Sequence, residues 1–340
     1  MSRSLRNFII ARIILTVPMI FILSTTVFFV MRVLPGDPIL SAVGPRVAPE
    51  DRERIREELG INRPILVQYV DFLKGIATLD FGNSLVRGRR PIRDELGEVF
   101  PATVELAVPS MIFASIVGVL SGAFAAEKRK KTADYSLRLG SVLVYSIPIF
   151  WMGLMMQLIF AGWLGLLPLS HRIDAEISLE LERTTNFYLI DSILSGNWKA
   201  FESAVLHLIL PSTTLGLALL GVYVRLTRVN MIEILNTDFI TAGRARGVPE
   251  RRLVYRHALR NSFIPILTLI GLQFAILLAG AVLTETVFSW PGIGRYLVDG
   301  INDRNFTVVQ ASVTVFAMLV AITSLVMDIL YAFIDPRIRY

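Results

Sequence analysis

The amino-acid sequence predicts an all-α, polytopic membrane protein with six transmembrane helices. Hydrophobic residues make up 54% of the 340 positions and charged residues 18%, below the roughly 25% charge of soluble domains. Six apolar runs are each long enough to cross a bilayer, which takes about 20 helical residues. The predicted spans are Phe8–Met31, Ala102–Ala126, Leu139–Leu167, Val205–Leu226, Ser262–Thr284 and Phe306–Ile334.

The distribution of basic residues predicts the orientation of these spans. Basic residues precede the first span, and the short segments after the second and fourth spans are strongly basic. Short loops rich in Lys and Arg remain on the cytoplasmic side of a membrane. We therefore expect both termini in the cytoplasm. The net charge of +6 is explained by this pattern and is not a sign of nucleic-acid binding.

The first span, with the N-terminus (1–31), is followed by a segment (32–101) that we expect to form a small helical subdomain outside the membrane. Pro49 and the acidic residues after it suit the start of a helix, and Gly60 suits its end. A second short helix is predicted over Ile65–Lys74. The other five spans form a core (102–340) with a cytoplasmic loop over 227–261.

Two later external segments carry further signals. The acidic run DAEISLELE (174–182) indicates a solvated face or, alternatively, a contact to an external partner or to a basic ligand group. In the segment SWPGIGR (289–295), proline and glycines predict a tight turn. Trp290 and Tyr296 can lie at the level of the lipid headgroups as interface aromatics, where amphipathic aromatic rings are enriched.

Few ionisable groups lie within the spans, and two glutamines lie near the middle of a span. Gln157 and Gln273 are candidates for the translocation path or for hydrogen bonds between helices. Asp328 is expected to make an interhelical hydrogen bond or to lie near the membrane interface, with gating or substrate contact as the alternative. This scarcity of ionisable groups argues against an ion-coupled carrier, which needs intramembrane relays. Gly118 and Gly122 form a GxxxG pattern that predicts close helix packing. Kinks are expected where a proline interrupts a span, at Pro18, Pro109, Pro148 and Pro211.

Several kinds of chemistry are excluded by the residues present. The chain has no cysteine, so disulfides and thiolate sites are impossible. Its three histidines lie in different segments, without the spacing of metal ligands. No GxxxxGK[ST] phosphate-binding loop occurs. We therefore expect no catalytic site, no metal site and no cofactor bound by this chain, and an ATPase working with it would be a separate polypeptide.

The stretch Asn236–Pro265 is unusually basic for a loop between spans. Asp238 is predicted to cap a short helix by accepting from the amides of Ile240 and Thr241. Gly247 is expected to end that helix, and a second helix is expected to begin near Glu250. The short helix either contacts a partner groove or lies on anionic lipid headgroups; the residues alone favour neither.

Four motifs resemble one known family. TAGRARG (241–247) is similar to the EAA-type loop of ABC importer permeases, with Thr241 and Gly243 in place of the first Glu and last Ala of that name. The longer RARGVPERRLVYRHALRNSFIP resembles the B-type permeases of dipeptide, oligopeptide and nickel importers, in which HALR stands where many importers have IxLP. LPGDP (34–38), SIPIFWMGL (146–154) and ETVFSWPGIGR (285–295) agree in the same order.

The resemblance implies a multi-pass permease of the cytoplasmic (inner) membrane that forms half of an importer pathway for di- or oligopeptides. Its partners would be a second, similar permease, two cytoplasmic ATPase subunits that hold ATP and Mg, an external substrate-binding protein and membrane lipid. The alternatives are a nickel-chelate or oligosaccharide cargo and, less well supported, a stand-alone secondary carrier. The helix that couples to the ATPase would use Asp238, Phe239, Thr241, Ala242, Gly243, Arg244, Ala245 and Gly247.

Overall fold

The computed structural model describes residues 3–33, 49–58, 60, 62–84 and 90–334. These residues form helices and connecting turns, with one isolated bridge between Asn83 and Pro91 and no extended strand. The LPGDP motif lies outside the described residues. The α-helices are α1 (Arg3–Val33), α3 (Pro49–Glu58), α4 (Ile65–Thr78), α5 (Ile92–Glu127), α6 (Thr132–Ser146), α7 (Ile149–Met156), α8 (Ala175–Glu180), α9 (Tyr188–Leu194), α10 (Trp198–Leu235), α11 (Asp238–Ala245), α12 (Glu250–Arg252), α13 (Leu259–Val287), α14 (Ile293–Asn302) and α15 (Phe306–Ile334). Two π-helical segments, η1 (Gln157–Trp163) and η2 (Leu253–Ala258), continue α7 and precede α13.

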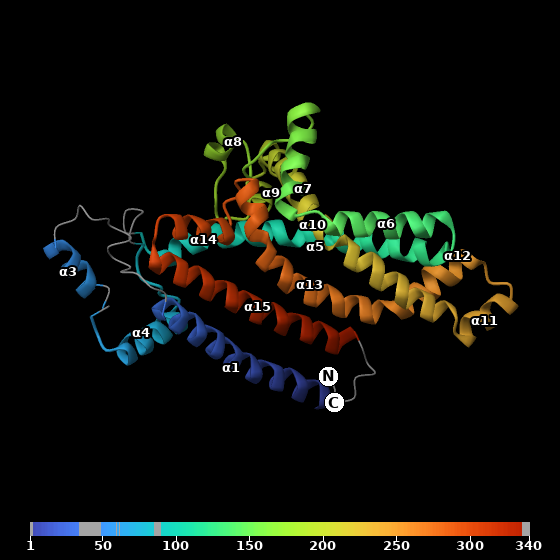
Figure 1. Ribbon diagram of the computed structural model, residues 1–340, viewed down its shortest axis with the longest axis horizontal. Coiled ribbons are helices and arrows are strands. Elements are labelled where there is room, and N and C mark those ends of the chain that lie inside the picture. Colours follow the sequence, from blue (N-terminus) through green and yellow to red (C-terminus); the bar gives the residue numbers. More distant parts are fainter. Residues whose placement is uncertain (1–2, 34–48, 59, 61, 85–89, 335–340) are drawn as a thin grey trace.

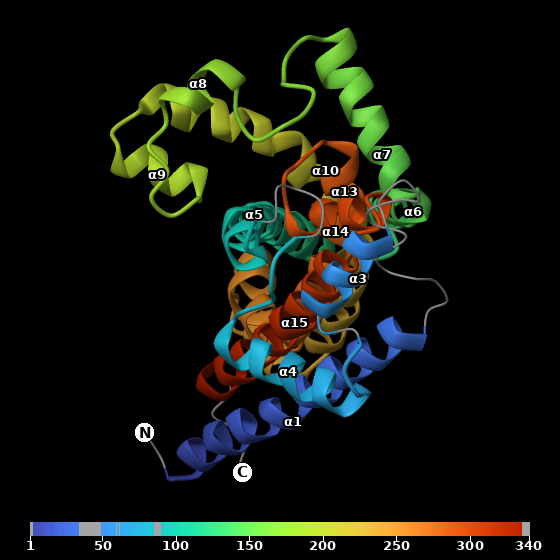
Figure 2. The same cartoon turned by 90° about the vertical axis from the view of Figure 1, so that its left-hand side faces the viewer.

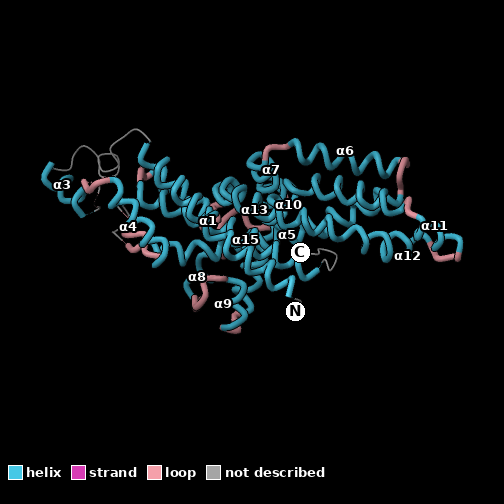
Figure 3. Tube along the Cα trace, turned by 90° about the horizontal axis from the view of Figure 1, so that it is seen from below, coloured by secondary structure: helices cyan, strands magenta, loops and turns pink. Residues whose placement is uncertain are grey.

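The predicted spans fall on long helices in five cases. The first, second, fourth and sixth lie on α1, α5, α10 and α15, and each of these four helices is long and apolar enough to cross a membrane. The fifth lies on α13. The long helices run roughly along the longest axis of the molecule, with α11 at one end and α3, α4 and α14 at the other (Figures 1 and 3).

The third apolar run departs from the single span that the sequence predicts. It is divided between α6 and the α7–η1 helix, which meet at an angle of 101°. Pro148 explains the break, because proline lacks an amide donor and forces the residue before it out of the helical region; Ile147 is extended, with φ −78° and ψ 128°. Pro18, Pro109 and Pro211 lie inside helices that continue past them.

The helices α5 and α10 pack closely along their length. A Cβ atom on Gly118 would lie 2.4 Å from the Cβ of Tyr223, and one on Gly122 would lie 2.7 Å from the Cβ of Thr227. The GxxxG pattern therefore has the packing role that the sequence predicts, since only glycine lets the two backbones approach this far.

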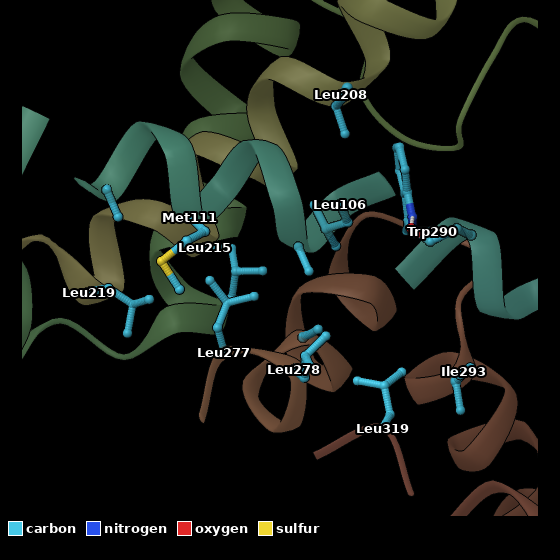
Figure 4. Close-up of a cluster of buried hydrophobic side chains, with 14 of the residues drawn as sticks. Leu106, Met111, Leu208, Leu215, Leu219, Leu277, Leu278, Trp290, Ile293 and Leu319 are labelled. Carbon is cyan, nitrogen blue, oxygen red and sulfur yellow. Dashed lines mark hydrogen bonds between the residues drawn. The ribbon is translucent and has the colours of Figure 1, made fainter. Parts of the chain in front are cut away.

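A central apolar core joins α5 and α10 to α13 and α15 (Figure 4). Leu106, Leu215 and Leu278 are almost completely buried in it. Trp290 belongs to the same core and is 1% exposed, and Tyr296 is 3% exposed. The prediction that these two aromatic residues lie at the lipid headgroups is therefore wrong, because each is enclosed by protein and has a polar partner there.

The N-terminal helices form a layer on one side of this core. The helices α1 and α15 lie side by side (Figures 1 and 2), and Arg12 Nη1 lies 3.3 Å from Asp328 Oδ2. Asp328 thus has the interhelical role expected of it. Helix α4 packs on α1 through Tyr69, whose ring lies 5.2 Å from that of Phe28. Both short helices predicted after the first span are present, as α3 and α4, and α4 packs against α1.

Candidate functional site

The short helix of the basic stretch is α11, and its N-terminal cap differs from the prediction. Thr237 is the cap residue, with φ −78° and ψ 157°, and Asp238 is the first residue of the helix. The amides of Ile240 and Thr241 donate to the carbonyl oxygen of Thr237, each at 3.2 Å. The backbone therefore satisfies the donors that the carboxylate was expected to bind, while Asp238 still lies at the positive end of the helix dipole.

The C-terminal end of α11 follows its local sequence. Gly247 has a φ of +75°, a conformation that costs other residues about 1–2 kcal/mol. The amide of Val248 donates to the Gly243 carbonyl at 3.1 Å and closes the last turn. Helix α12 then begins at Glu250, directly after Pro249. Both of these boundaries confirm the prediction.

A buried side chain fixes α11 to the ends of the spans. Ile240 is 0% exposed and lies in an apolar cluster with residues from α5, α10 and η2. The buried members of this α11 cluster are Ala123, Ala126, Met231, Ile240, Leu253, Val254 and Ala258. The other buried residues come from α5, α10 and η2, so apolar contacts hold α11 against three further helical segments.

The predicted partner-contacting residues divide between two faces of α11. Asp238, Thr241, Ala242, Arg244, Ala245 and Gly247 are exposed, and Phe239 is 48% exposed. Gly243 instead faces inward, because a Cβ atom there would lie 2.8 Å from Leu253 Cδ2. The exposed face carries small side chains beside one aromatic ring, a shape that allows a protein groove to approach closely.

Arg244 turns back toward its own loop. Its Nη2 donates to Glu250 Oε1 at 2.8 Å and its Nε donates to Oε2 at 3.0 Å. This two-point contact, with the guanidinium charge, holds the pKa of Glu250 below its ordinary value. Arg244 therefore braces the turn between α11 and α12, a role that its sequence position alone did not indicate.

Two more polar contacts tie the neighbouring loops together, and the sequence analysis missed both. Arg228 on α10 donates to both oxygens of Asp134 at 2.6 and 2.7 Å, which joins α10 to α6. Tyr255 on η2 donates to Glu127 Oε2 at 2.8 Å, which joins η2 to α5. Burial and the Glu127 carboxylate raise the pKa of Tyr255 to about 12. The partners lie 94 and 128 residues apart, so no local pattern reveals them.

The two glutamines proposed for a translocation path lie apart. Gln157 is 8% exposed and its amide donates to the carbonyl oxygens of Leu169 at 2.8 Å and Val287 at 3.2 Å. It therefore connects the turn after η1 to the end of α13. This is the hydrogen-bonding role between helices that the sequence analysis gave as the alternative to a place in the translocation path. Gln273 is half-buried on α13, about 21 Å along the helix from Val287.

At the opposite end of the molecule, a buried carboxylate holds the SWPGIGR segment. Glu285 is 0% exposed and accepts from Thr103 Oγ1 at 2.7 Å and from the Arg295 amide at 3.0 Å. A Cβ atom on Gly292 would lie 2.2 Å from its carboxylate, so glycine is required there. Trp290 Nε1 donates to the carbonyl oxygen of Ala102 at 2.8 Å. The turn is thereby bound to α5.

A second buried charge at this end is Arg172. Its Nε donates to Glu105 Oε2 at 3.1 Å and its guanidinium lies 3.8 Å from the centre of the Tyr188 ring. Both charged side chains are at most 6% exposed. This pair joins α5 to a protruding lobe made of α8 and α9 (Figure 2). The sequence analysis did not identify this pair.

Comparison with known proteins agrees with this architecture. Residues 118–340 match the family model described as a binding-protein-dependent transport system inner membrane component, and residues 5–107 match the N-terminal model of the same transport systems. The chain is 42% identical to a di/tripeptide transport system permease protein of Pseudomonas aeruginosa, over 98% of this chain and 99% of that protein.

Two further relatives come from Escherichia coli. A dipeptide transport system permease protein of strain K12 is 39% identical over 98% of this chain and 99% of its own length. A glutathione transport system permease protein of strain O1:K1 / APEC is 35% identical, again over 98% and 99%. With the family match and the apolar helices, these similarities show that the chain belongs to the binding-protein-dependent inner membrane permeases of ABC transporters and is a multi-pass protein of the inner membrane.

Proposed function

We propose that this chain forms one half of the transmembrane pathway of an ATP-driven importer for di- and oligopeptides. A second, related permease completes the pathway, and an external binding protein delivers the cargo. The relatives named for di/tripeptides, dipeptides and glutathione support this cargo class, since glutathione is itself a short peptide. Nickel chelates and oligosaccharides remain the alternative cargoes, and no feature of the described residues favours them.

The coupling role of α11 rests on one observation. Ile240 is buried in the α11 cluster, whereas the outer face of the same helix is exposed. A partner bound to that face therefore acts on three helical segments through an apolar anchor. In this proposal α11 lies in a groove of a cytoplasmic ATPase subunit, and two such subunits bind ATP and Mg. Their closure draws the paired permeases together and changes which side of the membrane the pathway faces.

The test places a charge on the exposed face of α11. Ala242→Glu is introduced, and the permease is purified with its partner permease and ATPase subunits. Ala242 is exposed, so the substitution leaves the α11 cluster intact and is expected to abolish both ATPase co-purification and peptide-stimulated ATP hydrolysis. Ala77→Glu is the matched control, because Ala77 is an exposed alanine on α4 at the opposite end.

Each result bears on a different part of the proposal. Unchanged ATPase binding and hydrolysis in the Ala242→Glu variant would show that α11 is not the coupling helix. Peptide uptake by proteoliposomes that contain the permeases without ATPase subunits would instead identify a secondary carrier. ATP-dependent uptake of nickel chelates or sugars but not of peptides would reassign the cargo and leave the coupling role standing.

A further inference from the structure

A cavity of about 870 Å³ opens at the end of the molecule opposite α11. Its walls are the turn after η1, the start of the protruding lobe, the first half of α10 and the SWPGIGR segment with α14. Figure 2 shows the lobe projecting to one side of α13 and α14, with α10 leading from it into the core. The volume lies within the roughly 300–1,000 Å³ of small-molecule sites. Arg172, His207, Asp174 and Arg295 are among the lining residues.

The charged groups on these walls differ in how they are paired. Arg172 is already neutralised by Glu105, as described above. Arg295 is half-buried on α14, and among the described residues no carboxylate lies within ion-pair distance of its guanidinium. The cavity-lining part of α14 also carries Asp299, one turn after Arg295, but Asp299 already has a partner. Arg295 is therefore the charged group on this wall that we assign to a ligand.

An acidic group is held on the facing wall. Asp174, just before α8, accepts from Ser203 Oγ at 2.7 Å, and its other oxygen lies 3.8 Å from Nε2 of the buried His207. The Asp174 side chain is nevertheless 60% exposed. Its carboxylate is thus oriented by two neighbours and remains open to a ligand cation. The cavity has a fixed negative group on the lobe side and a positive group on α14.

We infer that this cavity binds the two charged ends of a short peptide, with Arg295 pairing the carboxylate and Asp174 pairing the ammonium group. A dipeptide is about 7 Å long when extended and fits the volume with room for side chains. The apolar part of the lining, such as Ile173 and Pro291, suits variable side chains. This inference rests on the proposed peptide cargo and adds a site for it on the permease itself.

Cysteine labelling gives a direct measurement of occupancy. The chain contains no cysteine, so Ala175→Cys places a single thiol on the cavity wall. In the assembled transporter without binding protein, dialanine is expected to slow maleimide labelling of this thiol in a concentration-dependent way. Dialanine blocked at both ends is expected to give no protection. Ala77→Cys, exposed and outside the cavity, is expected to label at the same rate with or without peptide.

Two charge variants in the Ala175→Cys background assign the ends of the peptide. Arg295→Gln is expected to raise the dialanine concentration for half-protection about tenfold, as expected for loss of one charge-assisted hydrogen bond. In the Arg295→Gln variant, dialanine and its C-terminal amide should protect the thiol at the same concentration. In the Asp174→Asn variant, dialanine and its N-acetyl form should instead protect the thiol at the same concentration. Lys199→Gln and Glu202→Gln are the controls, because each removes one positive or one negative charge from an exposed residue of α10 outside the cavity. Both should leave the preference for free over amidated and over acetylated dialanine unchanged.

The outcomes separate this inference from the proposed function. The assignment of Arg295 and Asp174 to the peptide ends would be overturned if free and doubly blocked dialanine protected the thiol equally. It would also be overturned if the two charge variants still preferred free dialanine over its amide and over its N-acetyl form. Import of dialanine by the complete transporter, measured in parallel, tests the function itself. If import proceeds and dialanine does not protect Ala175→Cys, the cavity site is wrong and the importer proposal stands. If dialanine protects but no peptide is imported, the site stands and the importer proposal fails.

Discussion

The short helix α11 and the SWPGIGR segment, which lie at opposite ends of the molecule, are held by different physical means. At the α11 end, Ile240 and its neighbours make an apolar cluster, and the ion pair between Arg244 and Glu250 lies at the surface. This end also contains a buried ion pair, Arg228 with Asp134, but that pair joins α10 to α6 and does not contact α11. At the opposite end, Glu285 and the Arg172–Glu105 pair are buried and bonded at fixed angles. Apolar contacts are non-directional, whereas a buried charge is costly unless its partners are in place.

This difference indicates how each end tolerates movement. A loop anchored by apolar packing can shift by a fraction of a turn while its side chains stay out of water. A loop held by buried charges keeps its geometry until a partner is lost, and then loses a large part of its stability. The α11 end therefore suits a surface that is moved repeatedly, and the opposite end suits a rigid frame. Four substitutions test this contrast.

The largest effect is expected from Arg172→Met. The substitution removes the cation and leaves the Glu105 carboxylate buried, at a cost of about 3–5 kcal/mol in stability. Thermal unfolding of the purified protein measures the loss. Arg183→Met is the control, because Arg183 also lies near the Tyr188 ring, at 5.2 Å, but is exposed. If the two variants unfold at the same temperature, the rigid-frame interpretation is wrong.

Ile240→Ala comes next, with an expected loss of about 2–5 kcal/mol from the cavity it leaves in the α11 cluster. The expected functional result is ATP hydrolysis that no longer responds to peptide, because α11 is no longer fixed to the spans. Phe239→Ala, on the exposed face, should weaken ATPase binding and leave unfolding almost unchanged. Identical behaviour of the two variants in both assays would contradict the division of α11 into an anchoring face and a partner face.

Gly247→Ala tests the end of α11. Because φ at this position is +75°, we expect a loss of about 1–2 kcal/mol, read as a lower unfolding temperature. Gly140→Ala provides a control of opposite sign. Gly140 lies within α6, has no neighbour within 4 Å of an added Cβ, and should gain about 0.5–1 kcal/mol. Stabilisation by both substitutions would show that the turn after α11 does not need glycine.

The smallest effect is expected from Arg244→Gln. The pair with Glu250 is largely exposed, so its loss should cost less than about 1 kcal/mol. Since the pKa of Glu250 is lowered in the folded protein, the contribution is present at neutral pH and disappears as the pH falls through that lowered value. Unfolding temperatures of wild type and variant should therefore differ slightly at pH 7 and converge below about pH 4. A difference that grows in acid would contradict this assignment.

Local signals in the sequence predicted the parts of the fold that depend on a few neighbouring residues. Pro49, Gly60, Gly247 and Glu250 mark helix boundaries where the structure has them, because caps and left-handed turns are determined within one helical turn. The apolar runs located the long helices for a similar reason. The break at Pro148 was predicted as a kink, and its full angle of 101° depends on what α7 packs against.

Long-range contacts could not be predicted in the same way. Trp290 has a polar edge and an apolar ring, so its sequence position is compatible with a lipid interface and with a core. It lies in the core because its indole N–H donates to the carbonyl oxygen of Ala102, which is 188 residues away. The pairing of Arg172 with Glu105 crosses 67 residues. At α11, the small residues and the glycine predicted the helix, but only the structure shows that Gly243 faces Leu253.

The close contact of α5 with α10 has a mechanical consequence. Because Gly118 and Gly122 bring the two backbones together, the pair behaves as a single stiff rod. Helix α5 has 36 residues and is about 54 Å long. Tilting such a rod by about 5° about one end moves the other end by roughly 5 Å. Under the proposed coupling, the distance between α11 and the proposed peptide cavity would act as a lever arm. A small displacement at the ATPase would then produce one in the cavity that is comparable to the length of a dipeptide.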